Sequence, residues 1–156
     1  MHPHSAAVAR SPIRFSAGAR PFLLTAPSEP TSPKIARDFV RAVLRSSPLT
    51  PLLDTAVLLT SEAVTSSHLR TPRSADILLR LLTAGHGLRI SVHDGAAVRR
   101  PPPAVPSQAR PPYDPVAEDA DHGLWLTGEL ADDWGTTPYA GGPRSASLWF
   151  ELYTVR

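Results

Sequence analysis

A carboxylate stands on a partly apolar side of a helical pattern at residues 58–69, LLTSEAVTSSHL. Leu58 and Leu69 flank Glu62 on that side, and Ser66 follows Glu62 by one helical turn. A carboxylate that acts as a general base must be partly shielded from water, as these leucines would shield it. Glu62 is therefore a candidate catalytic base. The alternative is a solvated helix carboxylate paired with a nearby arginine.

A second acid closes a strand pattern at residues 88–94, LRISVHD. The apolar residues of this strand alternate with polar ones, and Asp94 keeps the parity of the apolar set. Period-two geometry therefore aims the Asp94 carboxylate at the covered side of a sheet. A small-molecule pocket needs such a buried acceptor to orient its ligand. The alternative is an ordinary turn acid before Gly95.

A glycine stands near the start of a third pattern, a helix expected over residues 122–134. Asp121 is a possible N-cap, and Gly135 would end the helix. Gly123 and Leu124 fall in its first turn, where a glycine lets backbone N–H groups and the helix dipole approach a phosphate. A simple helix-start glycine is an equally good interpretation of Gly123.

The elements that would position these groups mix strands and helices. Hydrophobic periodicity predicts strands at 20–26, 75–83 and 88–94, helices at 33–46, 51–69 and 122–134, and two closing strands. The glycines of the AGHG turn would supply positive φ. The proline-dense segment 98–121 is expected to be a long loop. The order predicts an α+β two-layer sandwich, with a mostly antiparallel mixed sheet covered on one face by about three helices.

The composition fits one domain of 156 residues, and the absence of cysteine excludes disulfides and thiolate metal sites. Residues 1–19 lack the apolar centre of a secretory signal, so we expect a disordered tail, then a single domain at 20–156, in a cytoplasmic protein. No apolar run is long enough for a membrane span. The net charge is +2 without a basic stripe interleaved with aromatics, which argues against nucleic acid as a partner.

Three segments together resemble the motif boxes of the GHKL (Bergerat-fold) ATP-binding domain. They are TSEAVTSSHLR at 60–70, ISVHDG at 90–95 and HGLWLTGELADDWG at 122–135. The closing GGPRSASLWFEL at 141–152 resembles the last hairpin of that domain. The chain is similar over about residues 20–155 to small anti-sigma-factor serine/threonine kinases of actinobacteria, which implies a HATPase domain with 98–121 as its ATP lid.

The resemblance implies a role for each matched residue. Glu62 would be the general base on the attacking hydroxyl or water, and Asp94 would accept a hydrogen bond from the adenine amino group. Ser66, Gly95, Gly123 and Leu124 would complete the nucleotide site. The resemblance also implies ATP or ADP as ligand, Mg²⁺ as cofactor, a sigma factor or anti-sigma-factor antagonist protein as partner, and a homodimer.

Three departures weaken the match. Ser66 replaces the asparagine that ligates magnesium in the family, and a hydroxyl is a poorer ligand for an ion that demands near-ideal octahedral geometry. Asp121 stands where the family has its first glycine, and a carboxylate at a helix start competes with an incoming phosphate. The segment HDGAAV at 93–98 keeps one glycine where the fuller motif has two.

Two functions remain open. The first is an ATP-dependent serine/threonine protein kinase that transfers the γ-phosphoryl group to a partner regulator. The second is a catalytically degenerate module that keeps the fold and binds a sigma factor or antagonist protein without turnover. Glu62 and Asp94 favour the first function, and Ser66 favours the second.

Overall fold

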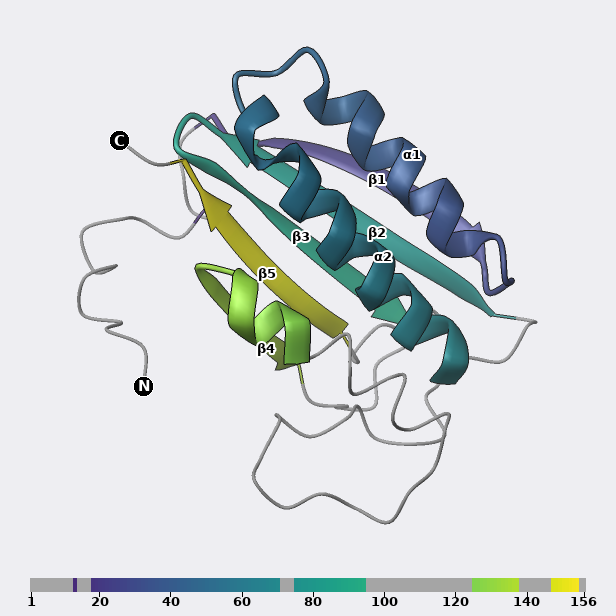
Figure 1. Ribbon diagram of the computed structural model, residues 1–156. Helices are drawn as coiled ribbons and strands as arrows, with labels where there is room; N and C mark the ends of the chain where they lie inside the picture. Colours follow the sequence, from purple (N-terminus) through teal and green to yellow (C-terminus); the bar gives the residue numbers. More distant parts are fainter. Residues whose placement is uncertain (1–12, 14–17, 71–74, 95–124, 138–146, 155–156) are drawn as a thin grey trace.

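A five-stranded sheet forms one layer of the protein, and helices lie against one face of that sheet (Figure 1). The computed structural model describes residues 13, 18–70, 75–94, 125–137 and 147–154. Its elements are β1 (Arg20–Pro27), α1 (Ser32–Leu44), the 3₁₀ helix η3 (Thr50–Leu52), α2 (Leu53–Arg70), β2 (Asp76–Ala84), β3 (Gly87–Asp94), a short helix at 125–130, β4 (Asp133–Thr137) and β5 (Ser147–Tyr153). The predicted α+β two-layer sandwich is confirmed.

The strand order is β1-β2-β3-β5-β4. Every pairing among the described strands is antiparallel, so the parallel component of the expected mixed sheet is not among them. Central β3 pairs with β2 on one side and with β5 on the other. Because side chains alternate along each strand, one set of residues faces the helices and the other set faces away. We call these two surfaces the helix face and the outer face.

The apolar residues of α1 explain how this helix packs. Ala36, Val40 and Leu44 recur every four residues and are buried, so one stripe of the helix faces the core. The spacing of the sequence before Pro33 predicts Ser32 as the N-cap of this helix, but Ser32 is the first residue of α1 and Thr31 occupies the N-cap position. The Ser32 hydroxyl accepts a hydrogen bond from the Glu29 N–H at 2.9 Å and donates to the Pro27 carbonyl, which stabilises the turn between β1 and α1.

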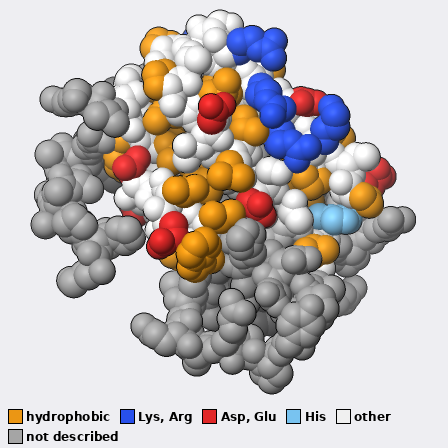
Figure 2. Space-filling model, in the orientation of Figure 1, with side chains coloured by type: hydrophobic (Ala, Val, Ile, Leu, Met, Phe, Trp, Pro, Cys, Tyr) orange, Lys and Arg blue, Asp and Glu red, His pale blue; other side chains and the backbone are white. Residues whose placement is uncertain are grey.

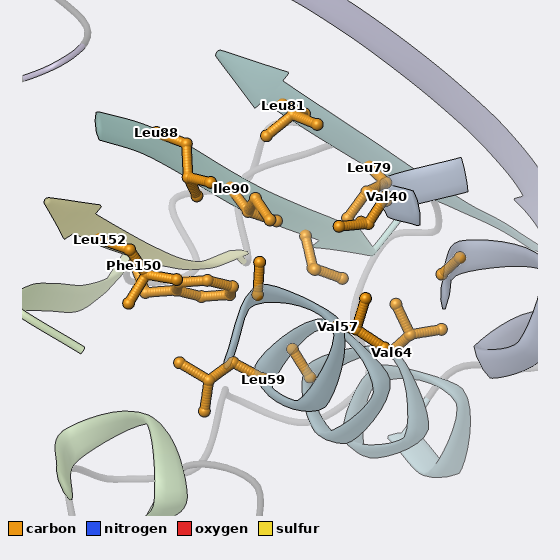
Figure 3. Close-up of a cluster of buried hydrophobic side chains, with 14 of the residues drawn as sticks. Val40, Val57, Leu59, Val64, Leu79, Leu81, Leu88, Ile90, Phe150 and Leu152 are labelled. Carbon is orange, nitrogen blue, oxygen red and sulfur yellow. The ribbon is translucent and has the colours of Figure 1, made fainter. Parts of the chain in front are cut away.

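The centre of the core lies between α2 and the helix face. Figure 3 shows Val57 and Val64 of α2 pointing toward the sheet, where Ile90 and Phe150 are fully buried, while Leu59 extends from the side of the helix below Phe150. The apolar spacing of α2 predicts a buried stripe made of Leu53, Ala56, Val57, Thr60 and Val64. Leu53 is partly exposed, and the other four are each less than a tenth exposed. The other buried residues among those described in this helix are Leu59, Ala63, Ser66 and Ser67.

Two prolines lie along the edge of β1 that faces away from β2. Ser28 N–H donates to the Ala75 carbonyl at 3.0 Å, and this pair continues the β1–β2 register. Hydrogen bonding alternates along an antiparallel pair, so the even residues of β1 bond to β2 and the odd residues direct their N–H and C=O groups outward. Pro21 and Pro27 belong to the outward set, where a missing N–H breaks no bond to β2. They also leave fewer donors for another strand to pair with.

The third predicted helix was too long at its C-terminal end. The helix ends at residue 130, and Asp133, Trp134 and Gly135 belong to β4. The Asp132 N–H donates to the Glu151 carbonyl at 3.0 Å, and the Asp132 side chain accepts the Tyr153 N–H at 2.7 Å. These two contacts with β5 redirect the chain, so the edge of the sheet outweighs the local helical pattern.

The glycines of the β2–β3 turn serve a different purpose from the predicted one. Among the described residues, only Gly18 has a positive φ, so neither Gly85 nor Gly87 is needed for a left-handed conformation. Gly87 is instead required by close packing. A Cβ at residue 87 would lie 2.3 Å from the backbone oxygen of Leu152 on the neighbouring strand.

Candidate functional site

The end of α2 and the end of β3 meet at the same end of the sandwich. Ser28, just after β1, is linked to His68 near the end of α2 by a hydrogen bond of 2.9 Å between Ser28 Oγ and His68 Nδ1. Since β1, β2 and β3 pair antiparallel in turn, β3 finishes at this same end, where Asp94 is the register partner of Ile77. The fold therefore brings the first two predicted motifs together.

Glu62 lies on one flank of α2. Leu59, Glu62 and Ser66 are spaced i, i+3 and i+7, so they follow one side of the helix. Leu59 is fully buried and packs near Phe150 of β5 (Figure 3). Glu62 is partly exposed, which leaves its carboxylate available to a ligand.

The shielding expected around Glu62 is weaker on one side. Leu58 is 42% exposed, so it encloses the carboxylate less than the sequence predicted, while Leu69 is half-buried. The opposite flank of α2 is covered by α1, where Arg37 Nη1 donates to Ser61 Oγ at 2.8 Å. Among the described residues, the flank that carries Glu62 is the one that α1 does not cover.

Ser66, the predicted magnesium ligand, is a buried residue. Its exposed fraction is 4%, and the neighbouring Ser67 is 1% exposed. A magnesium ion keeps several of its waters when it binds, so it needs space around each protein ligand. The burial of Ser66 therefore argues for a structural role of this hydroxyl and against direct metal ligation.

The remaining predicted site residues lie wholly or partly outside the residues that the structure describes. The side chain of Asp94 is outside the described residues, although its backbone is part of β3. Gly95, Gly123, Leu124 and the lid segment 98–121 also lie outside them. Of the predicted nucleotide site, the structure thus describes Glu62, Ser66 and the backbone of Asp94.

One hydroxyl inside the core lacks a partner. Thr60 is fully buried at the centre of α2, and its Oγ1 has no hydrogen-bond partner within the part of the chain that the structure describes. A buried and unsatisfied hydroxyl costs stability. Apolar side chains pack around this part of α2, so a ligand would bind at the end of the sandwich and not at its centre.

The charges of the helix layer are unevenly distributed. Figure 2 shows Lys and Arg side chains gathered over α1, where Lys34, Arg37, Arg41 and Arg45 follow one another at helical spacing. Asp38 lies among them and forms ion pairs with Lys34 at 2.8 Å and with Arg41 at 3.3 Å. The hydrogen bond from Lys34 lowers the pKa of Asp38. Glu62, by contrast, lies on the flank of α2 away from α1.

Sequence patterns gave no indication of a charged cluster on the outer face. Arg89 of β3 and Glu151 of β5 are register partners, and their Nη1 and Oε2 atoms lie 3.0 Å apart. Tyr153 donates its hydroxyl to Glu151 Oε1 at 2.5 Å, and the Arg89 guanidinium lies 3.9 Å from the centroid of the Trp149 ring. The only available signal was the alternation in β5, which places these polar residues on one face.

Comparison with known proteins identifies no relative. No protein-family model matches this chain, and no curated protein matches it. Within the described segments, no three His, Asp or Glu side chains are grouped so that they could hold a metal ion. None of the helices described here is both long enough and apolar enough to cross a membrane.

Proposed function

We propose that this chain is an ATP-binding regulatory protein of the cytoplasm with a Bergerat-type fold, which transfers the γ-phosphoryl group of ATP to a serine or threonine of a partner regulator. The observation that carries the proposal is that α2, which holds Glu62, and β3, which ends at position 94, finish at the same end of the sandwich. Both motifs that resemble the GHKL boxes belong to these two elements. A sigma factor or its antagonist is the proposed partner, bound by a homodimer.

The arrangement supports this chemistry in two ways. Glu62 is partly exposed on the flank of α2 that also holds the buried Leu59 and Ser66, so its carboxylate can meet a hydroxyl or water. Position 94 ends a central strand, where one carboxylate could accept a hydrogen bond from the adenine amino group. Mg²⁺ would neutralise charge on the phosphates during transfer.

The burial of Ser66 favours a second candidate function. A protein that has lost its direct magnesium ligand could keep the fold, bind a sigma factor or antagonist protein, and turn over no ATP. The two functions differ in whether nucleotide binding depends on magnesium and in whether phosphate is transferred.

Thermal unfolding with ATP or ADP, with and without Mg²⁺, tests the proposal directly. A ligand at about 100 times its Kd stabilises the folded protein by about 2.7 kcal/mol. For a domain of this size, each kcal/mol raises Tm by about 2–4 °C. No shift with either nucleotide would reject ATP binding. A shift that is unchanged by Mg²⁺ would support the degenerate module.

Three substitutions assign the site, and a fourth serves as a control. Asp94→Asn should abolish the nucleotide shift, whereas Asp54→Asn, an exposed acid at the start of α2, should leave it unchanged. Glu62→Gln should keep the shift and reduce phosphoryl transfer by about 10²–10⁴-fold. Ser66→Asn should strengthen the response to Mg²⁺, and an unchanged response would contradict the assignment of this position.

A further inference from the structure

The outer face contains a buried carboxylate with three donors. Glu151 is 1% exposed. Its Oε1 accepts the hydroxyl of Tyr153, and its Oε2 accepts Arg89 Nη1 at 3.0 Å and the backbone N–H of Ile13 at 3.2 Å. Two of these donors are side chains of the sheet itself. The third comes from a residue 138 positions earlier in the chain.

A small apolar surface, here called the apolar wall, lies beside this carboxylate. Leu82 of β2 and Tyr153 of β5 are buried, at 6% and 8% exposed, and Ala84 packs beside them. The side chain of Ile13 fills the remaining space and is fully buried. This cluster is separate from the main core, which lies on the helix face.

Ile13 satisfies both features of the site at once. Its N–H reaches the Glu151 carboxylate, and its side chain covers the apolar wall. A peptide residue with an aliphatic side chain and a free backbone N–H presents this combination. Because Arg89 and Tyr153 orient the carboxylate, the place of the peptide N–H is set before the peptide binds.

Leu23 provides the contrast on the same face. It is also aliphatic and lies opposite Arg80 on the outer face, yet it is 63% exposed. Outward-facing aliphatic residues on this sheet are therefore not covered as a rule. The burial of Ile13 reflects the acceptor and the wall, not a general collapse of the chain onto the sheet.

We propose that the outer face carries a docking site for a peptide segment with an aliphatic side chain, and that Ile13 of this same chain occupies it. The site selects an uncharged residue, since its side chain is fully buried and an acidic one would meet the Glu151 carboxylate. Of the described residues that precede β1, Ile13 contributes one side chain and one N–H to the site, so we expect a competing peptide to displace it.

Limited digestion with trypsin tests the assignment in the full-length chain. Docking of Ile13 should protect the bond after Arg14, because cleavage tracks the population of the open state, and Ile13→Ala should speed this cleavage by about tenfold or more. Leu23→Ala, the matched control, should leave the rate unchanged. Equal rates for the wild-type and Ile13→Ala chains would overturn the proposal.

Binding of a peptide in trans is the second test. A synthetic peptide of residues 8–18, VARSPIRFSAG, should bind a full-length Ile13→Asp chain, whose own segment is released, more tightly than it binds the wild-type chain. The same peptide carrying Ile13→Asp should bind neither. Failure of the wild-type peptide to bind the Ile13→Asp chain would overturn the proposal.

Sedimentation at several concentrations checks which copy supplies Ile13. A wild-type oligomeric state, monomer or dimer, that Ile13→Asp leaves unchanged supports docking within one chain when the Arg14 bond is protected. A wild-type dimer that Ile13→Asp converts to monomer would show exchange between two copies and would overturn the assignment to the same chain. None of these measurements uses a nucleotide, so their failure is distinct from a failure of ATP binding.

Discussion

The two faces of the sheet are stabilised by different kinds of contact. On the helix face, Leu81, Leu88, Ile90 and Phe150 are fully buried beneath the helices by apolar packing alone. On the outer face, the most buried residue is the charged Glu151, held by a set of directed polar contacts.

This difference has an energetic consequence. Burial of apolar surface is non-directional, so the helix face tolerates small shifts of its side chains. A buried carboxylate depends on its donors, and removing the cationic one leaves a buried charge that the remaining hydrogen bonds do not compensate. The outer face should therefore be the more sensitive to single polar substitutions, and the following experiments test that expectation.

Loss of Arg89 is expected to have the largest effect. Arg89→Met leaves the Glu151 carboxylate buried without its cation, which should lower the free energy of unfolding by about 3–5 kcal/mol. Urea denaturation at neutral pH measures the change. The double variant Arg89→Met/Glu151→Gln should recover part of the loss, because it removes the uncompensated charge.

An exposed ion pair serves as the control for Arg89. Lys34→Met breaks the ion pair with Asp38. The side chains of Lys34 and Asp38 are both more than half exposed, so the free energy of unfolding should not change measurably. Equal effects of Lys34→Met and Arg89→Met would contradict the special role assigned to the outer face.

Gly87 tests the close approach of β3 and β5. In Gly87→Ala the new Cβ would lie 2.3 Å from the Leu152 backbone oxygen, so the strands must move apart, at a cost of about 1–3 kcal/mol. Thermal or urea unfolding measures the loss. Gly85→Ala is the matched control in the same turn, because no heavy atom lies within 4 Å of its added Cβ.

A substitution of Thr60 on the helix face is expected to raise the free energy of unfolding, whereas those of Arg89 and Gly87 lower it. Thr60→Val replaces a buried hydroxyl that is unsatisfied within the described residues by a methyl group of similar size. It should raise the free energy of unfolding by about 1 kcal/mol. Thr55→Val, at a partly exposed position of the same helix, should change it less. A destabilised Thr60→Val chain would show that this hydroxyl has an unrecognised function.

The smallest expected effect is on the pH dependence of stability. Burial and the hydrogen bond to Glu151 raise the pKa of Tyr153 in the folded protein. The unfolded tyrosine loses its proton at about pH 10, so this contribution is complete below that pH and is lost as the pH rises above it. Unfolding at pH 8–11 should show a shallower alkaline decline for Tyr153→Phe than for the wild-type chain. Parallel curves would contradict the burial of this hydroxyl.

Local patterns were sufficient for most of the described elements. The period-3.6 spacing of α1 and α2 and the alternation of β2 and β3 predicted their type and their bounds within a few residues. The segment 131–135 was assigned wrongly, because its helical pattern competes with backbone contacts from β5 that lie far away in sequence.

The candidate site was only partly predictable. The spacing of Glu62 and Ser66 placed them on one side of a helix, but it could not show that Leu58 would be 42% exposed or that Ser66 would be buried. Exposure depends on which neighbouring element covers each flank. That is a property of helix packing, which the sequence of one helix does not contain.

By itself the sequence determined the α+β class, the apolar face of the sheet and the helices that cover it, because these follow from periodicities within single segments. Only the tertiary structure decided the pairing of Arg89 with Glu151 and the burial of Ile13 beside them. These contacts join residues 62 and 138 positions apart, and no local spacing carries information over such separations.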